Sequence, residues 1–359
     1  MKKKIALTWG WTGWHVFPLI SIYNSLKRSK NIEFIWIWEE DSLEEEIAEK
    51  YKIEFHDIAS WKIRRYFDWR NFYEPLKNLT WIFQWLYYIL KYKIDLVFSK
   101  WGFVSLPLCI AAFILRKPIY IHESDTTTWL SNKLIWKIAT KIFYTFPNNL
   151  IDWEKHILTW QILNPELLEV DIIETPEPPK QESFFSKKTI DKEKIDVLVI
   201  AWSQGSKIIF ENLISVLNNL LDLNFTIILW DKNQNFKQQF EKFSNVKTYD
   251  FVTQKELANL YQISDIAITR WWATTLWELF FFWIHSIIIP LSNSAWNHQQ
   301  LNAEYFHKNF WFDILDENKN DFNMDLFRLL IKYKDLRKNW LNLKWFTRAT
   351  DIIKEELKK

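Results

Sequence analysis

Short apolar runs alternate with amphipathic stretches along the first half of the chain. The amphipathic stretches repeat apolar residues every three to four positions, as residues 16–30 (VFPLISIYNSLKRSK) do. The apolar runs are rich in β-branched and aromatic residues and occupy residues 5–8, 32–37, 95–100, 118–124 and 141–146. Strands that alternate with helices in this way are typical of βαβ units with a parallel sheet. The first half is therefore predicted to be a doubly wound α/β domain.

The same pattern restarts after an interruption. Residues 165–194 are rich in Pro, Glu and Lys and are expected to connect two domains. Apolar runs then recur at residues 195–201, 225–229, 245–251, 265–270 and 286–291. We predict two doubly wound domains, residues 1–164 and 165–340, and a C-terminal helix within residues 341–359 that packs back on the N-terminal domain. Ligands of such sheets bind outside the carboxyl ends of the strands, so two facing domains imply a cleft between them.

Tryptophan occupies turns where this fold needs glycine. The strand-to-helix turn LTWGWTGWHVFP (residues 7–18) should bind a phosphate, which requires glycine for close approach of the backbone. The chain has 24 Trp and 4 Gly, whereas average usage would give roughly 25 Gly in this length. We infer that most of the tryptophans are glycines encoded by UGA; the alternative is a genuinely Trp-rich protein. The sites assigned to glycine are Trp9, Trp11, Trp14, Trp101, Trp129, Trp202, Trp271, Trp272 and Trp277, whereas Trp36 and Trp69 are candidates for authentic tryptophan.

Bulk composition narrows the classes of function. The net charge of +2 does not indicate a nucleic-acid binder. The single cysteine, Cys109, excludes an internal disulfide and fits a reducing cytoplasm. No apolar run reaches the roughly 20 residues that a membrane-spanning helix needs, and the N-terminal MKKK is not followed by the apolar segment of a signal peptide. The histidines show no paired spacing and the chain has no Asp-x-Asp, so neither a metal nor a cofactor is expected.

Several polar residues follow predicted strands. Thr12 and His15 lie in the first turn, where an imidazole can serve as a general base or simply as a polar residue at a helix N-terminus. The second domain opens on AWSQGSK, which offers Ser203 to a phosphate. Glu278 follows TRWWATTLW and can bind a ribose diol or merely stabilise the helix N-terminus. Gln299 and Gln300 suit sugar hydroxyls, although solvated helix-start glutamines explain them equally.

Six motifs, in order over nearly the whole chain, together resemble one family. They are TWGWTGWHVFP, KWGFVSLP, IHESDTTTWLSNK, AWSQGS, RWWATTLWEL and NHQQLNA. The series is similar to that of the MurG family, the bacterial UDP-N-acetylglucosamine (UDP-GlcNAc):lipid I N-acetylglucosaminyltransferases of glycosyltransferase family 28. The match requires glycine at Trp9 or Trp11 and at Trp14, Trp101, Trp129, Trp202 and Trp272, which independently supports the recoding inference.

The resemblance implies a GT-B fold, with two Rossmann-like domains facing a central cleft, and an inverting transfer of GlcNAc to the C4 hydroxyl of MurNAc in lipid I. By it, His15 is the catalytic base, and UDP-GlcNAc and lipid I are the substrates. The acceptor pyrophosphate is expected at Thr12, Gly13, Trp14, Trp101, Gly102 and Asp125. The UDP-GlcNAc site is expected to comprise Thr12, Gly13, Asp125, Asn164, Ser203, Val252, Ala273, Thr274, Thr275, Glu278, Gln299 and Gln300.

The chain departs from the family pattern at a few positions. Asn164 stands where a phosphate-binding arginine is common, and Asp125 replaces an asparagine, so weaker diphosphate binding or a compensating lysine is expected. Other functions stay open: another GT-B UDP-sugar transferase with a lipid acceptor, or a catalytically silent nucleotide-binding protein if the tryptophans are real.

A lipid-linked acceptor implies peripheral contact with the cytoplasmic face of the inner membrane. Residues 62–93 interleave Lys and Arg with many aromatic residues, as interfacial membrane patches do. A helix packed on the sheet, with its cations solvated, explains this composition equally well.

Overall fold

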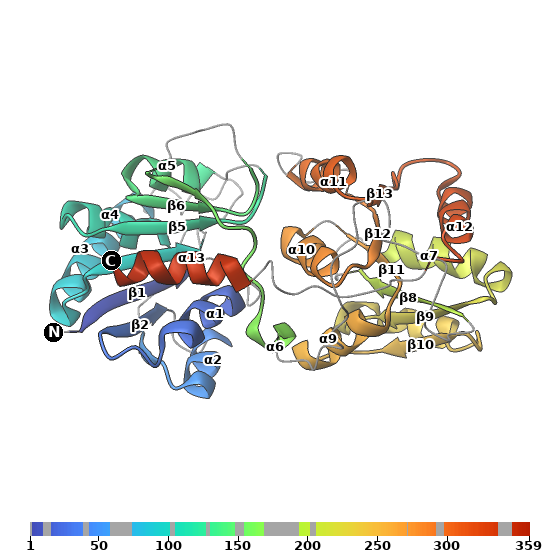
Figure 1. Ribbon diagram of the computed structural model, residues 1–359, viewed down its shortest axis with the longest axis horizontal. Coiled ribbons are helices and arrows are strands. Elements are labelled where there is room, and N and C mark those ends of the chain that lie inside the picture. Colours follow the sequence, from blue (N-terminus) through green and yellow to red (C-terminus); the bar gives the residue numbers. More distant parts are fainter. Residues whose placement is uncertain are drawn as a thin grey trace. The chain divides into compact units, whose positions relative to one another are not determined.

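The computed structural model describes residues 2–9, 16–38, 43–57, 74–100, 105–126, 130–147, 154–168, 194–201, 206–270, 272–291, 298–336 and 347–359. The chain forms two compact units (Figure 1). One unit comprises Met1–Pro165 and Phe346–Lys359, and the other comprises Glu166–Trp345. The C-terminal segment thus returns to the unit that holds the N-terminus.

The first unit is built on a parallel sheet of seven strands in the order β3-β2-β1-β4-β5-β6-β7. The strands are β1 (Lys3–Trp9), β2 (Ile32–Trp38), β3 (Glu54–Asp57), β4 (Leu96–Lys100), β5 (Ile119–Glu123), β6 (Lys141–Tyr144) and β7 (His156–Leu158). The helices are α1 (Val16–Leu26), α2 (Leu43–Tyr51), α3 (Glu74–Tyr92), α4 (Ser105–Ile114), α5 (Leu130–Ile138) and α13 (Thr347–Lys358). The order reverses direction between β1 and β4, where a doubly wound sheet binds its ligands.

Helices cover both faces of this sheet because successive side chains of each strand point to opposite faces. Ile5 and Leu7 of β1 pack with α1, α2 and α13. Ala6, between them, packs on the opposite face with α3, α4 and α5. All five residues of β4 are buried, as expected for a central strand covered on both faces.

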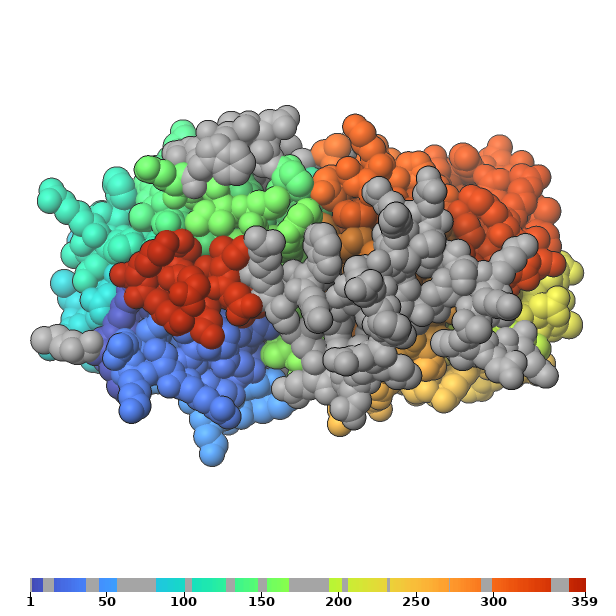
Figure 2. All heavy atoms as spheres, viewed as in Figure 1, coloured from blue at the N-terminus to red at the C-terminus, as the bar shows by residue number. Residues whose placement is uncertain are grey.

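The C-terminal helix α13 is part of the core of the first unit. Its apolar residues Ala349, Ile353 and Leu357 recur every four positions and are fully buried among residues of α1 and β1. Glu356 forms an ion pair with Lys141 at the start of β6, with 2.6 Å between the carboxylate oxygen and the amine nitrogen. Figure 2 shows the side chains of α13 (red) lying against those of the N-terminal helices (blue).

The second unit repeats the architecture with six parallel strands in the order β10-β9-β8-β11-β12-β13. The strands are β8 (Ile195–Ile200), β9 (Leu223–Ile228), β10 (Val246–Tyr249), β11 (Ile266–Thr269), β12 (His285–Ile288) and β13 (Asp313–Ile314). The α-helices are α6 (Pro165–Leu168), which begins at the unit boundary, α7 (Ser206–Val216), α8 (Lys237–Phe240), α9 (Gln254–Ile263), α10 (Ala273–Phe281), α11 (His298–Asn309) and α12 (Phe322–Lys332). The 3₁₀ helices are η4 (Leu217–Asn219) and η5 (Asp231–Phe236). The two doubly wound parallel sheets confirm the predicted α/β fold class.

Three tryptophans of the described segments have left-handed backbone angles: Trp160 (φ 67°), Trp230 (φ 57°) and Trp283 (φ 54°). Trp230 combines its φ with ψ 166°, a region that is essentially restricted to glycine. Trp283 follows the last turn of α10, where left-handed glycine is common. In the other described residues with positive φ, the residue is lysine or arginine, so a positive φ alone does not indicate glycine. The combination of φ and ψ at Trp230 is therefore the stronger indication of glycine.

Candidate functional site

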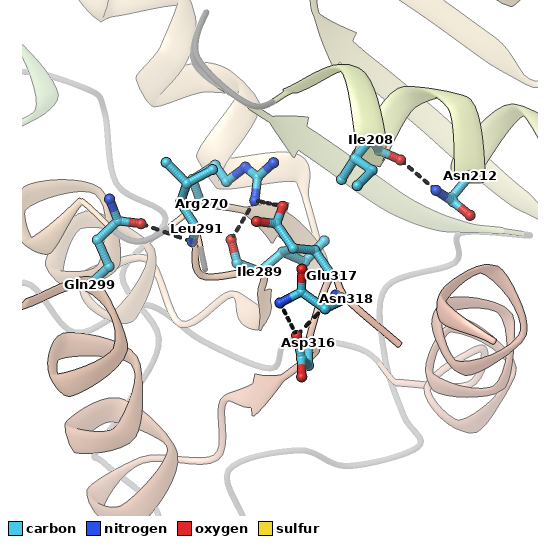
Figure 3. Close-up of polar contacts among 9 residues, drawn as sticks. All are labelled: Ile208, Asn212, Arg270, Ile289, Leu291, Gln299, Asp316, Glu317 and Asn318. Atoms are coloured by element: carbon cyan, nitrogen blue, oxygen red, sulfur yellow. Dashed lines mark hydrogen bonds and ion pairs between the residues drawn. The ribbon is translucent and has the colours of Figure 1, made fainter. Parts of the chain in front are cut away.

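A buried ion pair joins the carboxyl ends of three strands in the second unit (Figure 3). Arg270 directly follows β11 and is 2% exposed. Its Nη1 donates to Glu317 Oε2 at 2.6 Å, beyond β13, and to the Ile289 carbonyl at 3.2 Å, beyond β12. Burial lowers the pKa of Arg270, whereas the hydrogen bond and charge of Glu317 raise it. The pair therefore fixes the edge of the sheet at which a ligand of this fold binds.

Helix α10 begins at this edge, three residues after Arg270. Ala273 and Thr275 in its first turn are buried, and Thr274 is partly exposed. The N-cap residue Trp272 makes no side-chain capping hydrogen bond to this helix. A helix N-terminus with this property can bind a phosphate through its N–H groups and its dipole.

Glu278 lies in the second turn of α10 and is 4% exposed. Its Oε2 accepts a hydrogen bond from the Tyr261 hydroxyl of α9 at 3.0 Å. Burial raises the pKa of Glu278 to about 8, although the hydrogen bond from Tyr261 acts in the opposite direction. The carboxylate predicted to bind the ribose is thus held by a neighbouring helix in a desolvated environment.

The other predicted donor residues of this unit lie in different surroundings. Val252 follows β10 and is buried. Gln299 is buried in the first turn of α11, and its Oε1 accepts from the Leu291 N–H at 2.8 Å (Figure 3). Gln300 instead donates to Glu304, one turn further along the same helix, at 3.0 Å. Gln299 therefore reaches the segment that follows β12, whereas Gln300 makes a contact within its helix.

The first unit has a buried amine at the corresponding edge of its sheet. Lys100 is the last residue of β4, and its Nζ donates to Ser124 Oγ at 3.0 Å, just beyond β5. Burial lowers the pKa of Lys100 to about 7, against the attraction of Asp125 and Glu123. Asp125 itself is partly exposed, and its N–H donates to Glu123 Oε1 at 3.3 Å.

A second polar group lies beside this amine. His122 in β5 is fully buried, with Nε2 at 3.3 Å from the Trp160 carbonyl and 3.4 Å from Thr145 Oγ1. Burial, and then the charge of Lys100, hold the pKa of His122 well below its usual value. Thr145 in turn donates to Gln161 at 3.1 Å. Asn164 is also buried, directly after Leu163, whose carbonyl accepts from Ser21 of α1.

Several predicted site residues lie outside the described residues: Thr12, Gly13, Trp14, His15, Trp101, Gly102 and Ser203. The structure also identifies four site-edge residues that the sequence reasoning did not single out: Lys100, Tyr261, Arg270 and Glu317. The sequence does carry a signal for Lys100 and Arg270, because each is a charged residue at the end of an apolar run. Tyr261 and Glu317 carried no comparable signal, since each reaches the site through a tertiary contact.

The part of the chain that the structure describes contains neither a cluster of metal-ligating side chains nor a membrane-spanning helix. Within those ranges, no group of three or more His, Cys, Asp or Glu residues is arranged to hold a metal ion. None of the helices in the same ranges has the length and apolar character needed to cross a bilayer.

Both units match known domains. The Glycosyltransferase family 28 N-terminal domain matches residues 5–144. The Glycosyltransferase family 28 C-terminal domain matches residues 197–341.

Known proteins resemble the chain over most of its length. The UDP-N-acetylglucosamine--N-acetylmuramyl-(pentapeptide) pyrophosphoryl-undecaprenol N-acetylglucosamine transferase of Clostridium botulinum (strain Langeland) is 37% identical over 320 residues, which is 88% of this chain and 87% of the relative. The protein of the same name from Clostridium tetani is 35% identical over 347 residues, 96% of this chain and 94% of the relative.

Solved structures share the fold. MurG of Acinetobacter baumannii superposes with a TM-score of 0.69 at 20% identity, over 98% of this chain and 95% of that one. A UDP-GlcNAc 2-epimerase from Neisseria meningitidis bound to UDP-GlcNAc gives 0.66 at 15% identity, over 99% of this chain and 100% of that one. These structures agree with the GT-B architecture. With both domains matched and relatives 35–37% identical over most of the chain, the protein belongs to glycosyltransferase family 28.

Proposed function

We propose that the protein transfers GlcNAc from UDP-GlcNAc to the C4 hydroxyl of MurNAc in lipid I, with inversion, and so produces lipid II for peptidoglycan synthesis. The observation that carries this proposal is the identity of 34–37% to transferases named for this reaction, over 88–96% of the chain. The 2-epimerases share the architecture at much lower identity, so they do not favour an epimerase activity.

The second unit binds the donor in this proposal. The first-turn N–H groups of α10, preceded by Trp272, interact with the diphosphate, and Glu278 accepts hydrogen bonds from the ribose hydroxyls. The Oε1 of Gln299 is engaged by the backbone, which leaves its amide nitrogen for a sugar hydroxyl. These roles are supported by the position of the α10 N-terminus, Glu278 and Gln299, which all follow the carboxyl ends of β11 and β12.

The first unit supplies the acceptor side. The C4 oxygen of MurNAc forms a bond to C1 of GlcNAc while the bond from C1 to the β-phosphate oxygen breaks. The hydroxyl proton passes to the imidazole of His15, and UDP leaves with the bonding electrons. Electrostatic stabilisation of the departing diphosphate comes from backbone N–H groups and helix dipoles.

A panel of acceptors tests the assignment. The protein, translated by its own host so that any recoded tryptophans carry their natural residue, is incubated with radiolabelled UDP-GlcNAc and lipid I, diacylglycerol or a sterol. Label is expected to enter the lipid I fraction alone. Transfer to diacylglycerol or the sterol in preference to lipid I would identify another GT-B transferase, and UDP binding without transfer would identify a catalytically silent protein.

His15→Ala tests the proposed base in the same assay. Turnover with lipid I should fall by roughly 10²- to 10⁴-fold, the usual contribution of a general base. The affinity for UDP should stay within about twofold, because His15 precedes α1 of the other unit. Loss of UDP affinity with full turnover at saturation would contradict the role.

Contact with the membrane is proposed through α3. Phe83, Tyr87 and Leu90 are spaced four and three residues apart and are 58–68% exposed on one side of the helix. Trp85 and Ile89, on the other side, are buried in the core of the unit. Helix α3 thus packs on the sheet with one face and presents two aromatic rings and one aliphatic side chain on the other.

Charge near this face favours an anionic lipid surface as its partner. Lys91 lies in the last turn of α3, with Nζ 4.9 to 5.9 Å from the ring centroids of Tyr87, Tyr88 and Tyr92. Helix α4, which packs against α3, adds Phe113 and Ile114, each 55% exposed. Exposed apolar groups beside a lysine match the interface of an anionic bilayer.

Sedimentation with vesicles tests this surface. Binding to phosphatidylglycerol vesicles should exceed binding to phosphatidylcholine vesicles and should fall about tenfold in Phe83→Ser/Leu90→Ser, since two large apolar side chains no longer insert. Phe251→Ser is the matched control, because Phe251 is 63% exposed in the other unit. Equal loss in both variants, or no preference for anionic vesicles, would remove α3 from the membrane contact.

A further inference from the structure

The hydroxyl of Tyr261 is directed at the carboxylate of Glu278 from a separate helix. The two residues are 17 positions apart in the chain, and the Oη to Oε2 distance is 3.0 Å. Tyr261 is 1% exposed and Glu278 is 4% exposed. This hydrogen bond engages Oε2 of Glu278 rather than Oε1.

Tyr261 is itself held firmly in place. Its ring packs against Phe282 with 5.1 Å between the ring centroids. Helix α9 begins with a capping box, in which Thr253 Oγ1 accepts from the Glu256 N–H and Glu256 Oε2 accepts from the Thr253 N–H at 2.7 Å. The phenol is therefore presented by a fixed element, as a group that orients a ligand-binding side chain should be.

The chemistry of the pair makes Tyr261 a donor at every working pH. Burial, and then the negative charge of Glu278, raise the pKa of Tyr261 well above its usual value, so the phenol keeps its proton. Glu278, by contrast, must lose its proton to bind the ribose diol. A carboxylate can accept hydrogen bonds from both ribose hydroxyls, whereas the protonated acid carries a hydrogen that it must itself donate. Burial opposes the ionised form, and the Tyr261 hydrogen bond supports it.

We propose that Tyr261 is a positioning residue for the sugar-nucleotide donor: its hydroxyl fixes the orientation of the Glu278 carboxyl group and favours the ionised form that binds the ligand, with Oε1 available to the ribose diol. This inference rests on the donor role given to Glu278 above. It does not depend on which acceptor receives the sugar.

Calorimetry of UDP binding between pH 6 and pH 9.5 tests the proposal. In the unsubstituted protein, UDP affinity should rise with pH up to about pH 8, because binding requires the ionised carboxylate. Tyr261→Phe should weaken UDP binding about tenfold near pH 7, the loss expected for a hydrogen bond to a charged group. The midpoint of the pH profile should move to higher pH, and part of the affinity should return at pH 9.5.

A matched control separates this role from general stability. Tyr333 also donates to a carboxylate of the second unit, Asp313 Oδ2, at 2.6 Å. Asp313 reaches His285 at the amino end of β12, the sheet edge opposite to the proposed donor site. Tyr333→Phe should therefore leave both the UDP affinity and the pH midpoint unchanged.

Two results would overturn the proposal: an unchanged pH midpoint in Tyr261→Phe, or an equal change in Tyr333→Phe.

If Tyr261→Phe does not fold, the release of protons on UDP binding tests the proposal instead. It is measured as the dependence of the calorimetric heat on the ionisation enthalpy of the buffer. UDP binding at pH 7 should release a proton from the unsubstituted protein and none from Glu278→Gln. Equal release from both would exclude the ionisation of Glu278. Absence of sugar transfer in the unsubstituted protein would refute the proposed reaction without affecting these binding results.

Discussion

The amine of Lys100 donates a hydrogen bond to the hydroxyl of Ser124 at 3.0 Å, at the carboxyl ends of β4 and β5. Lys100 is fully buried, so its positive charge is desolvated, and the nearby Asp125 and Glu123 offset this only in part. Such a group makes the stability of the first unit depend on pH.

Lys100→Met should therefore change the pH dependence of stability. The pKa of Lys100 is about 7 in the folded protein and 10.5 as its ordinary value. Between these values the unfolded chain holds a proton that the folded chain lacks, so the stability of the unsubstituted protein rises with pH. Denaturant unfolding at pH 7 and pH 9 should show Lys100→Met as the more stable at pH 7, with an advantage that shrinks at pH 9. The exposed Lys308→Met is the control, and an advantage of constant size would contradict the argument.

Separating Arg270 from Glu317 should be costly for folding. Arg270→Met or Glu317→Leu leaves one buried charge without its partner and should lower the free energy of unfolding by about 3–5 kcal/mol. The double variant should recover most of that loss, because neither charge is then left alone. UDP affinity should fall in both single variants, since the pair holds the strand ends beside α10.

The exposed pair Lys237–Asp250 provides the comparison for this prediction. Its amine and carboxylate lie 2.7 Å apart with side chains 38% and 52% exposed. Lys237→Met should cost no more than about 1 kcal/mol. If the double variant Arg270→Met/Glu317→Leu were no more stable than the single variants, the loss of stability would not come from leaving one buried charge unpaired.

Ile353 of α13 should be essential to the stability of the first unit. It is fully buried with Ile5 and Leu7 of β1, so Ile353→Ala should cost about 2–5 kcal/mol in denaturant unfolding. Ile331→Ala removes the same atoms from a side chain that is 38% exposed on α12, and its cost should be clearly smaller. Equal effects would mean that α13 contributes little to the core.

Glycine is proposed at Trp230 in the protein made by its host, in addition to the sites inferred from the sequence. The angles φ 57° and ψ 166° strain any residue with a Cβ, typically by about 1–3 kcal/mol. In Trp230→Gly, relief of this strain should offset part of the packing lost with the buried indole. The tryptic peptide 208–232 contains Trp230 as its single tryptophan, so its mass in host protein distinguishes the two residues; a tryptophan mass would contradict the proposal.

The central strands could be predicted from the sequence because burial on both faces makes them continuous apolar runs, as in Leu96–Lys100. Three short edge strands were not expected: Glu54–Asp57, His156–Leu158 and Asp313–Ile314. Because these strands contain polar residues and are partly exposed, they show no apolar run in the sequence. They form because the neighbouring strand presents unpaired backbone N–H and C=O groups to which they can hydrogen-bond.

At the candidate site too, local sequence patterns could be read but tertiary contacts could not. Glu278 and Gln299 could be proposed as site residues from the sequence because each follows a strand within a recognisable local motif. Their partners could not, since Tyr261 and the Leu291 N–H meet them only when separate elements pack together. The left-handed angles of Trp160 and Trp230 likewise required the folded backbone.

The most direct test of the proposed reaction is the structure of its product. Host-translated protein is incubated with UDP-GlcNAc and lipid I, and the lipid product is analysed by mass spectrometry and proton NMR while released UDP is measured. We predict one added N-acetylhexosamine per lipid I, β-linked to C4 of MurNAc, with one UDP released for each sugar transferred. An α-linkage, a different hydroxyl, or conversion of UDP-GlcNAc to its 2-epimer without transfer would contradict the account.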